Sequence, residues 1–181
     1  MSRTSLKVEL LSHTPHPDEV VATGARMCYS SAGVEDLIRG VAEKDQSKYL
    51  QRIVDMGHLS PIEHASFTFA VEGVSRALLA QITRHRIASF SVQSQRYVSQ
   101  ANQTGSFPYI LPPSIEALGP EAVAEYDRQM ETMQQWYNQW QAKLGAKGEK
   151  SNEDARFVLP NACETRMVIT MNARELMHFF S

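Results

Sequence analysis

The sequence contains few of the features that mark a secreted or membrane protein. Its two cysteines, Cys28 and Cys163, are far apart and in unrelated contexts. One disulfide between them stays open as an alternative, but reduced thiols in a cytosolic protein are favoured. No run of about 18 apolar residues could span a bilayer. Residues 1–16 lack the apolar core of a signal peptide. We therefore expect an intracellular, cytoplasmic protein with no membrane partner.

Positive charge is also scarce. The formal net charge is -2, with 18 Lys and Arg against 20 Asp and Glu. A dedicated nucleic-acid binder usually carries a strong positive excess, so we expect no nucleic-acid partner. Cations that bind an anion must then be concentrated locally. A glycine-rich turn between a strand and a helix is absent too, which argues against a dinucleotide-binding fold of the doubly wound kind.

Hydrophobic patterning predicts a single domain over residues 1–181 with an α+β fold, in which a mixed, mainly antiparallel sheet packs against helices. Period-two alternation predicts strands at 7–11, 64–71 and 165–171. Apolar residues at helical spacing predict helices near 18–28, 45–57, 76–82, 120–144, 151–159 and from 173 onward. We expect Ser75 and Ser151 to cap two of them, and Val20, Val21, Ala25 and Cys28 to face inward on the first.

The long helix near 120–144 carries an apolar stripe from Val123 to Leu144. Methionine and aromatic residues on such a stripe are typical of a core or of a subunit interface.

The segment from Arg84 to Arg96 is the first candidate for chemistry. It begins with Arg84-His85-Arg86 and contains no acidic residue, and serine or glutamine stands at positions 89, 91, 93, 94 and 95 before Arg96. Arginine's planar donor fork suits phosphate oxygens, and serine hydroxyls can complete the shell. The alternative is that Arg84 and Arg86 face water at a helix end. A cationic, hydroxyl-rich segment in an acidic protein favours an anionic ligand.

Two further groups are candidates. Gly57–His64 places His58, Glu63 and His64 at a loop mouth, but their spacing fits no known zinc motif, so we expect no metal. Later, Asn172, Arg174 and His178 cluster, and Arg174 and His178 share a helix face. The alternative for that cluster is a solvated ion pair with the neighbouring Glu175.

These segments resemble the flavin-dependent thymidylate synthase family. Its hallmark is Arg-His-Arg, seven residues, then Ser, here Arg84-His85-Arg86 through Ser94. Four more blocks agree in the same order and span most of the chain: GHLSPIEH at 57–64, SQRY at 94–97, ARFVLP at 155–160 and NARELMHFF at 172–180.

The resemblance implies methylation of deoxyuridylate (dUMP) to thymidylate. Methylenetetrahydrofolate would be the carbon donor, FAD would carry the hydride, and NADPH would supply it. It also implies a homotetramer with shared active sites. By match to the motifs, flavin contacts fall on His58, Ser60, Arg84, His85, Arg86, Asn172, Arg174 and His178. Nucleotide contacts fall on Gln81, Arg84, Ser94, Gln95, Arg96 and Arg156.

Two departures from the family pattern stand out. Val92 occupies a position where many members carry an acidic residue, and the sequence stops at Ser181, where the family continues with a further arginine that polarises the pyrimidine. We therefore expect this chain to lack that C-terminal segment and assign it no catalytic residue. Two alternatives contain no flavin: a nucleotide- or RNA-binding module without redox chemistry, and another phosphate-handling transferase.

Overall fold

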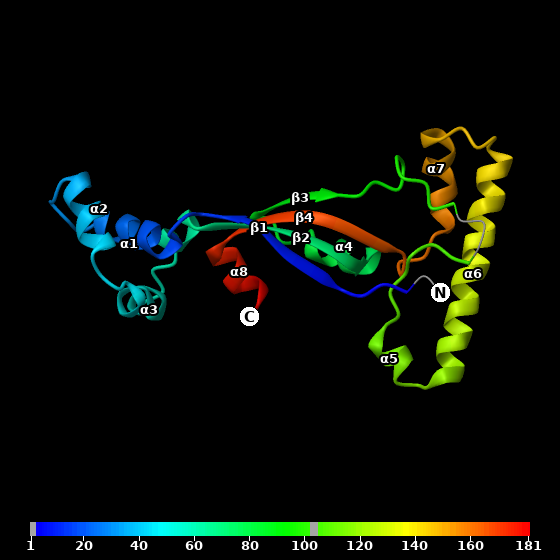
Figure 1. The fold of residues 1–181 in the computed structure, drawn as a ribbon, viewed down its shortest axis with the longest axis horizontal. Coiled ribbons are helices and arrows are strands. Elements are labelled where there is room, and N and C mark those ends of the chain that lie inside the picture. Colours follow the sequence, from blue (N-terminus) through cyan, green and yellow to red (C-terminus); the bar gives the residue numbers. More distant parts are fainter. Residues whose placement is uncertain (1–2, 102–104) are drawn as a thin grey trace. The chain divides into compact units, whose positions relative to one another are not determined.

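The computed structural model describes residues 3–101 and 105–181 (Figure 1). The chain divides into two compact units. Unit 1 comprises Val8 and the described residues before it, Val71–Arg84 and Ser91–Val168. Unit 2 comprises Glu9–Ala70, His85–Phe90 and Ile169–Ser181. We describe each unit by itself.

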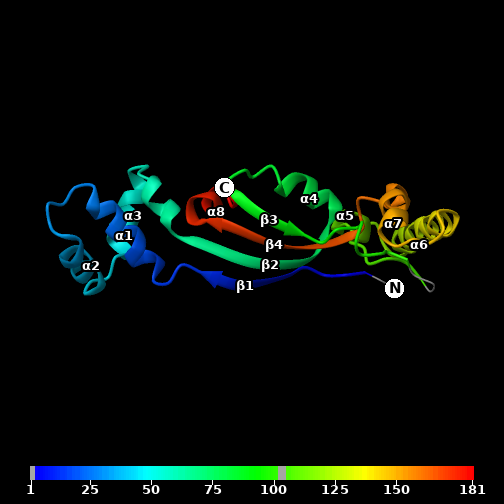
Figure 2. The ribbon, with the colours of Figure 1, turned by 90° about the horizontal axis from the view of Figure 1, so that it is seen from above.

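Four strands form one sheet in the order β1-β2-β4-β3 (Figure 2). They are β1 (Lys7–His13), β2 (Ser66–Ser75), β3 (Ala88–Val92) and β4 (Glu164–Asn172). Antiparallel pairing of β2 with β4 brings the hydroxyls of Thr68 and Thr170 to 2.9 Å, and the Gly73 amide to 3.1 Å from Glu164. The predicted α+β fold with an antiparallel sheet is confirmed. Strand β3 was not predicted, because its serines were interpreted only as ligand-binding residues.

Strand β4 shows the predicted alternation most clearly. Thr165, Met167, Ile169 and Met171 are buried, whereas Arg166 between them is exposed. A period of two follows from the pleat, which sends successive side chains to opposite faces. Strand β1 differs, because all seven of its residues are exposed at the sheet edge.

Gly73 permits a close approach inside unit 1. Its φ is +72°, and a Cβ built there would lie 1.9 Å from the carbonyl oxygen of Ser5. Only glycine combines a positive φ with no side chain, so β2 requires it at this point.

Unit 2 contains α1 (Pro17–Met27), α2 (Val34–Ala42), α3 (Ser47–Asp55), the short helix η1 (Ser60–His64) and α8 (Ala173–Phe179). Its core gathers Val21, Ile62 and Ala65, with Leu50 and Val54 packed against them. The prediction for α1 was wrong at two positions. Val20 and Cys28 are exposed, because the buried stripe of α1 consists of Val21, Ala22 and Ala25.

Unit 1 contains α4 (Arg76–Ile82), α5 (Pro113–Glu116), the long helix α6 (Pro120–Lys143), α7 (Glu149–Ala155) and η2 (Arg156–Val158). The long helix is confirmed, and its Met130 packs with Phe107, Tyr109 and Cys163. The Ser75 hydroxyl caps α4 by accepting from the amide of Leu78 at 3.1 Å. The predicted cap at Ser151 is wrong. Ser151 lies inside α7, buried, and its hydroxyl accepts from the amide of Lys147 at 2.7 Å.

A polar cluster fastens the N-terminal residues to α6 within unit 1. Asp127 accepts hydrogen bonds from Arg3 and from the hydroxyl of Tyr109, and the amide of Thr4 donates to the Tyr109 carbonyl at 3.1 Å. The Arg3 guanidinium lowers the pKa of the Asp127 carboxyl. Burial, followed by the bond to Asp127, raises the pKa of Tyr109 to about 12. Over residues 3–101 and 105–181, no helix has the length and apolar character to cross a bilayer.

Candidate functional site

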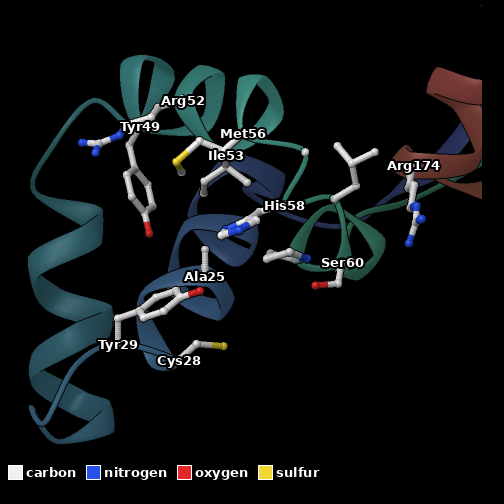
Figure 3. Close-up of a pocket in the computed structure, with 13 residues that line it drawn as sticks. Ala25, Cys28, Tyr29, Tyr49, Arg52, Ile53, Met56, His58, Ser60 and Arg174 are labelled. Carbon is white, nitrogen blue, oxygen red and sulfur yellow. The ribbon is translucent and has the colours of Figure 1, made fainter.

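A pocket of about 700 Å³ lies in unit 2 (Figure 3). We call it the unit-2 pocket. Helix α3 contributes Tyr49, Arg52 and Ile53, while Ala25 comes from α1. Figure 3 shows His58 between the side chains of these two helices. The full lining is Ala25, Cys28, Tyr29, Tyr49, Arg52, Ile53, Met56, Gly57, His58, Leu59, Ser60, Pro61 and Arg174.

The chemistry of this lining is apolar and aromatic with a few cationic groups. Tyr29, Tyr49 and Met56 offer flat or polarisable surface, whereas Arg52 and Arg174 offer guanidinium donors. None of the residues that line the pocket is acidic. The pocket therefore suits a ligand that combines a flat ring system with negative charge.

Arg26 fixes one wall of the unit-2 pocket. Its guanidinium carbon lies 4.0 Å from the centre of the Tyr49 ring, and its Nη2 donates to Gln46 at 3.3 Å. Gln46 is itself buried and donates to the Val41 carbonyl at 2.8 Å. A cation over a tyrosine face restricts the ring, so the Tyr49 wall is held in place before any ligand binds.

Arg174 reaches the unit-2 pocket from α8. Its guanidinium pairs with Glu63 of η1 and not with the neighbouring Glu175. The partner is thus Glu63 and not Glu175, because side chains at adjacent helix positions point in different directions, but a solvated ion pair is what the alternative for this cluster predicted. Both Arg174 and Glu63 are about half exposed, so the pair leaves donor groups for a ligand.

Glu175 instead supports His85. Its Oε1 lies 2.7 Å from the Nδ1 of His85, and its side chain is only 8% exposed. The side-chain oxygen of Asn172 accepts from the amide of Glu175 at 2.8 Å and thereby caps α8. The ring of His85 also lies 5.6 Å from that of His178 and 5.4 Å from that of Phe179. The structure thus brings three predicted flavin residues together: His85 contacts the buried carboxylate of Glu175, Asn172 binds the Glu175 amide, and His178 lies beside the His85 ring.

Arg84 and Arg86 on either side of His85 are exposed. Arg84 belongs to unit 1 and Arg86 to unit 2. Neither guanidinium has a hydrogen-bond or ion-pair partner in the part of the chain that the structure describes. Two unpaired cations next to a held histidine agree with an anion-binding role, although they agree equally with solvent exposure.

A second pocket, of about 360 Å³, lies in unit 1, and we call it the unit-1 pocket. It contains the predicted nucleotide residues Gln95 and Arg156 together with a second guanidinium, that of Arg76. The rest of its lining is Phe157, Leu159, Pro160 and Asn161, so no acidic side chain neutralises the two arginines there. Paired guanidinium groups beside amide donors are suited to a phosphate.

Ser94 and Arg96 have identified partners in unit 1. The Ser94 hydroxyl accepts from the amide of Arg96 at 3.2 Å. The Arg96 guanidinium pairs with Glu149 at 2.9 Å and with Glu153 at 3.2 Å, although no acid lies near Arg96 in the sequence. Gln95 is buried and donates to the Cys163 sulfur at 3.4 Å. Neither Ser94 nor Arg96 lines the unit-1 pocket. The remaining nucleotide candidate, Gln81, is exposed on α4 and does not line it either.

Residues 9–181 match the family described as thymidylate synthase complementing protein. The flavin-dependent thymidylate synthase of Clostridium tetani is 47% identical over 185 residues, which cover 97% of this chain and 73% of that protein. The chain belongs to the flavin-dependent thymidylate synthase family. The resemblance that the motifs indicated is thereby confirmed.

Two further proteins of known name are similar to this family member. The flavin-dependent thymidylate synthase of Nitratidesulfovibrio vulgaris is 47% identical over 188 residues, covering 99% of this chain and 75% of that protein. The structure of a UMP/dUMP methylase, PolB, from Streptomyces cacaoi bound with 5-Br dUMP has a TM-score of 0.75 and 25% identity. The matched region covers 100% of this chain and 79% of the methylase chain.

Sequence reasoning on this family member missed several pocket residues. Tyr29, Tyr49 and Arg52 line the unit-2 pocket, and Arg76 lines the unit-1 pocket. Arg76 carried a usable signal, because a cation in the first turn of a helix opposes the helix dipole. Tyr49 and Arg52 carried none, since a tyrosine and an arginine on an amphipathic helix are ordinary. No group of three or more His, Cys, Asp or Glu side chains in residues 3–101 and 105–181 could hold a metal ion.

Proposed function

We propose that this protein is an enzyme that methylates dUMP to thymidylate with bound FAD. The observation that carries the proposal is the unit-2 pocket, whose acid-free lining combines tyrosines, a methionine and two arginines. The relatives' name, flavin-dependent thymidylate synthase, agrees with it.

The unit-2 pocket fits a flavin dinucleotide in size and chemistry. A volume of about 700 Å³ lies within the range of small-molecule and cofactor sites. Arg52 and Arg174 would hold the diphosphate, and the walls made by Tyr49 and Met56 would hold a ring. FAD, when bound, supplies the hydride. The flavin-binding set remains His58, Ser60, Arg84, His85, Arg86, Asn172, Arg174 and His178, with Arg52 and Tyr49 added.

The unit-1 pocket would bind the phosphate of dUMP. Arg76 and Arg156 present two guanidinium groups there, and Asn161 adds amide donors. A methylase of similar fold binds a brominated dUMP, which agrees with this substrate class. The nucleotide-binding set remains Gln81, Arg84, Ser94, Gln95, Arg96 and Arg156, with Arg76 added. The protein's own contribution would be orientation and cationic stabilisation of charge on the pyrimidine.

The finer assignments rest on the family resemblance. Methylenetetrahydrofolate would donate the carbon, NADPH would supply the reducing equivalents, and the working form would be a cytoplasmic homotetramer with shared active sites. The exposed apolar side chains of edge strand β1, such as Val8, Leu10 and Leu11, favour assembly, because single chains rarely leave an apolar edge strand uncovered.

Flavin uptake and product formation test the proposal together. The purified protein is mixed with FAD at tens of micromolar, dialysed and scanned for flavin absorbance. The holoprotein is then supplied with dUMP, methylenetetrahydrofolate and NADPH, and thymidylate is measured by chromatography. We expect retained flavin, and we expect any thymidylate to form only when the holoprotein and dUMP are both present. A protein that takes up no FAD contradicts the enzyme proposal and favours a nucleotide-binding module.

A further inference from the structure

One face of α7 is directed at Arg96. The side-chain amide of Asn152 donates to the Arg96 carbonyl at 2.7 Å. Glu149 and Glu153 approach the guanidinium of the same residue at 2.9 Å and 3.2 Å. The three α7 residues are spaced i, i+3 and i+4, so they occupy one side of the helix. A single helix face thus holds both the backbone and the side chain of Arg96.

Asn152 is in turn held by α6. Its Oδ1 accepts from the hydroxyl of Tyr137 at 3.3 Å and from the side-chain amide of Gln141. Asn152 and Tyr137 are 2% and 0% exposed, and Gln141 is buried as well. Each polar atom of the Asn152 amide therefore has a partner inside the protein, and its position depends on α6.

The same cluster also forms hydrogen bonds with the backbone of Gln100. The amide of Gln100 donates to the hydroxyl of Tyr137 at 3.2 Å. Its carbonyl accepts from the buried amide of Gln134 at 2.9 Å. The segment Arg96–Gln100 is consequently fastened at both ends by side chains of α6 and α7.

Burying so many amide and hydroxyl groups has a cost that a purely packing role would not require. Polar groups removed from water are tolerated only when they are hydrogen-bonded, and apolar residues of similar size would fill the space more favourably. The partners here are backbone atoms of the segment that carries Arg96. A cluster that satisfies backbone groups of one irregular segment fixes the conformation of that segment.

We propose that Asn152, supported by Tyr137, is a positioning residue that holds Arg96 for the phosphate-bearing nucleotide. This inference rests on the proposed function, in which Arg96 binds dUMP. Asn152 acts through the Arg96 backbone and needs no contact with the ligand. Glu149 and Glu153 orient the guanidinium, which remains 40% exposed and open to a ligand.

The first experiment needs no ligand. Amide hydrogen exchange is followed by mass spectrometry in the full chain, in Asn152→Ala and in Tyr137→Phe. Gln139→Leu is the control, since it removes an exposed amide from α6. We expect faster exchange in peptides covering residues 96–100 in both test variants, with α1 and α3 unchanged. Exchange of residues 96–100 equal to wild type in both variants overturns the positioning role, whether or not the protein binds dUMP.

The second experiment measures dUMP and FAD binding by calorimetry. We expect Asn152→Ala to raise the dUMP dissociation constant about tenfold, as expected for one lost buried hydrogen bond, and to leave that for FAD within about twofold. Equal losses of both affinities would indicate general damage and overturn the inference. If Asn152→Ala unfolds, Tyr137→Phe answers the same question, because it removes only one hydroxyl.

A double-mutant cycle identifies the route. If Asn152 acts through Arg96, then Asn152→Ala combined with Arg96→Gln binds dUMP no more weakly than Arg96→Gln alone. Fully additive losses contradict that route. If the wild-type protein binds no dUMP, the proposed function is wrong, but the exchange experiment still decides whether Asn152 holds the segment.

Discussion

The carboxylate of Glu175 lies 2.7 Å from Nδ1 of His85, although the two residues are 90 positions apart in the sequence. Glu175 is 7% exposed and its amide is held by Asn172. A hydrogen bond to Nδ1 sets the orientation of the imidazole ring and leaves Nε2 as the nitrogen that is available to a ligand. The middle residue of the Arg-His-Arg motif is therefore oriented by α8.

We predict that Glu175→Gln weakens FAD binding about tenfold. The amide keeps the shape of the carboxylate but loses the charge-assisted hydrogen bond that holds His85. Flavin fluorescence titration measures the effect. Glu35→Gln, an exposed acid on α2, is the matched control and should change nothing. Unchanged flavin affinity in Glu175→Gln would show that His85 needs no orientation from α8.

Arg52 gives a test of the unit-2 pocket that does not depend on the motif. It lines the pocket and has no ion-pair partner among the described residues. We predict that Arg52→Gln raises the FAD dissociation constant about fivefold, and that added salt reduces the difference from wild type, because a partly exposed charge is screened. Arg39→Gln, an exposed arginine paired with Asp36 on α2, serves as the control. Equal affinities at low salt would remove Arg52 from the flavin site.

Ser94 should be a ligand-binding hydroxyl and not a nucleophile. Its oxygen accepts from the Arg96 amide, and no base is hydrogen-bonded to it in the described chain. A serine nucleophile requires such a base. We predict that Ser94→Ala weakens dUMP binding about tenfold without abolishing turnover. A covalent adduct trapped at Ser94 of the wild-type protein would contradict this role.

Asp127 should give the fold a defined acid sensitivity. The Arg3 guanidinium, and secondarily the Tyr109 hydroxyl, lower the pKa of Asp127 below its ordinary 3.8 in the folded protein. A carboxyl whose pKa is depressed by folding stabilises the protein above its unfolded pKa, and this stabilisation is lost as the pH falls through the folded pKa.

We therefore expect Asp127→Asn to melt below wild type at pH 7, by about 2–4 °C for each kcal/mol lost. The difference in melting temperature between the variant and wild type should disappear as the pH falls below 3.8. Asp36→Asn, from an exposed ion pair, should show little effect at either pH. A gap between Asp127→Asn and wild type that does not depend on pH would rule out the charged pair as its cause.

Assembly can be tested at β1. We predict a tetramer at micromolar concentration by analytical ultracentrifugation, and a smaller species for Leu10→Lys, which places a charge on the exposed apolar edge. Glu9→Gln lies on the opposite face of the same strand and should leave the mass unchanged. A wild-type protein that sediments as a monomer contradicts the homotetramer.

Local patterns predicted the regular elements well. Helix α6 and strand β4 were found because their apolar periods are long and uninterrupted. Helix α2 was missed even though Leu37 and Val41, its buried residues, are four apart. That spacing was a usable signal, but a nine-residue helix between polar loops offers few repeats. Strand β3 was missed because its serines were interpreted as ligand-binding residues, and only five residues carry its alternation.

The candidate site was only partly accessible from the sequence. The arginine-rich motif predicted which residues gather cationic charge, yet the acids paired with Arg96 are 53 and more positions away. Tertiary packing decides such partners, and no local rule gives them. For the same reason, the sequence could not predict that His85 would be held by Glu175 rather than lie free.

The path of the chain through the two units has a practical consequence for anyone wishing to study one pocket alone. The chain passes from one unit to the other after Val8, Ala70, Arg84, Phe90 and Val168. No contiguous fragment contains the whole of one unit without residues of the other, so cleaving the polypeptide once cannot release either pocket's unit by itself. Isolating either would require rejoining separate segments with new linkers.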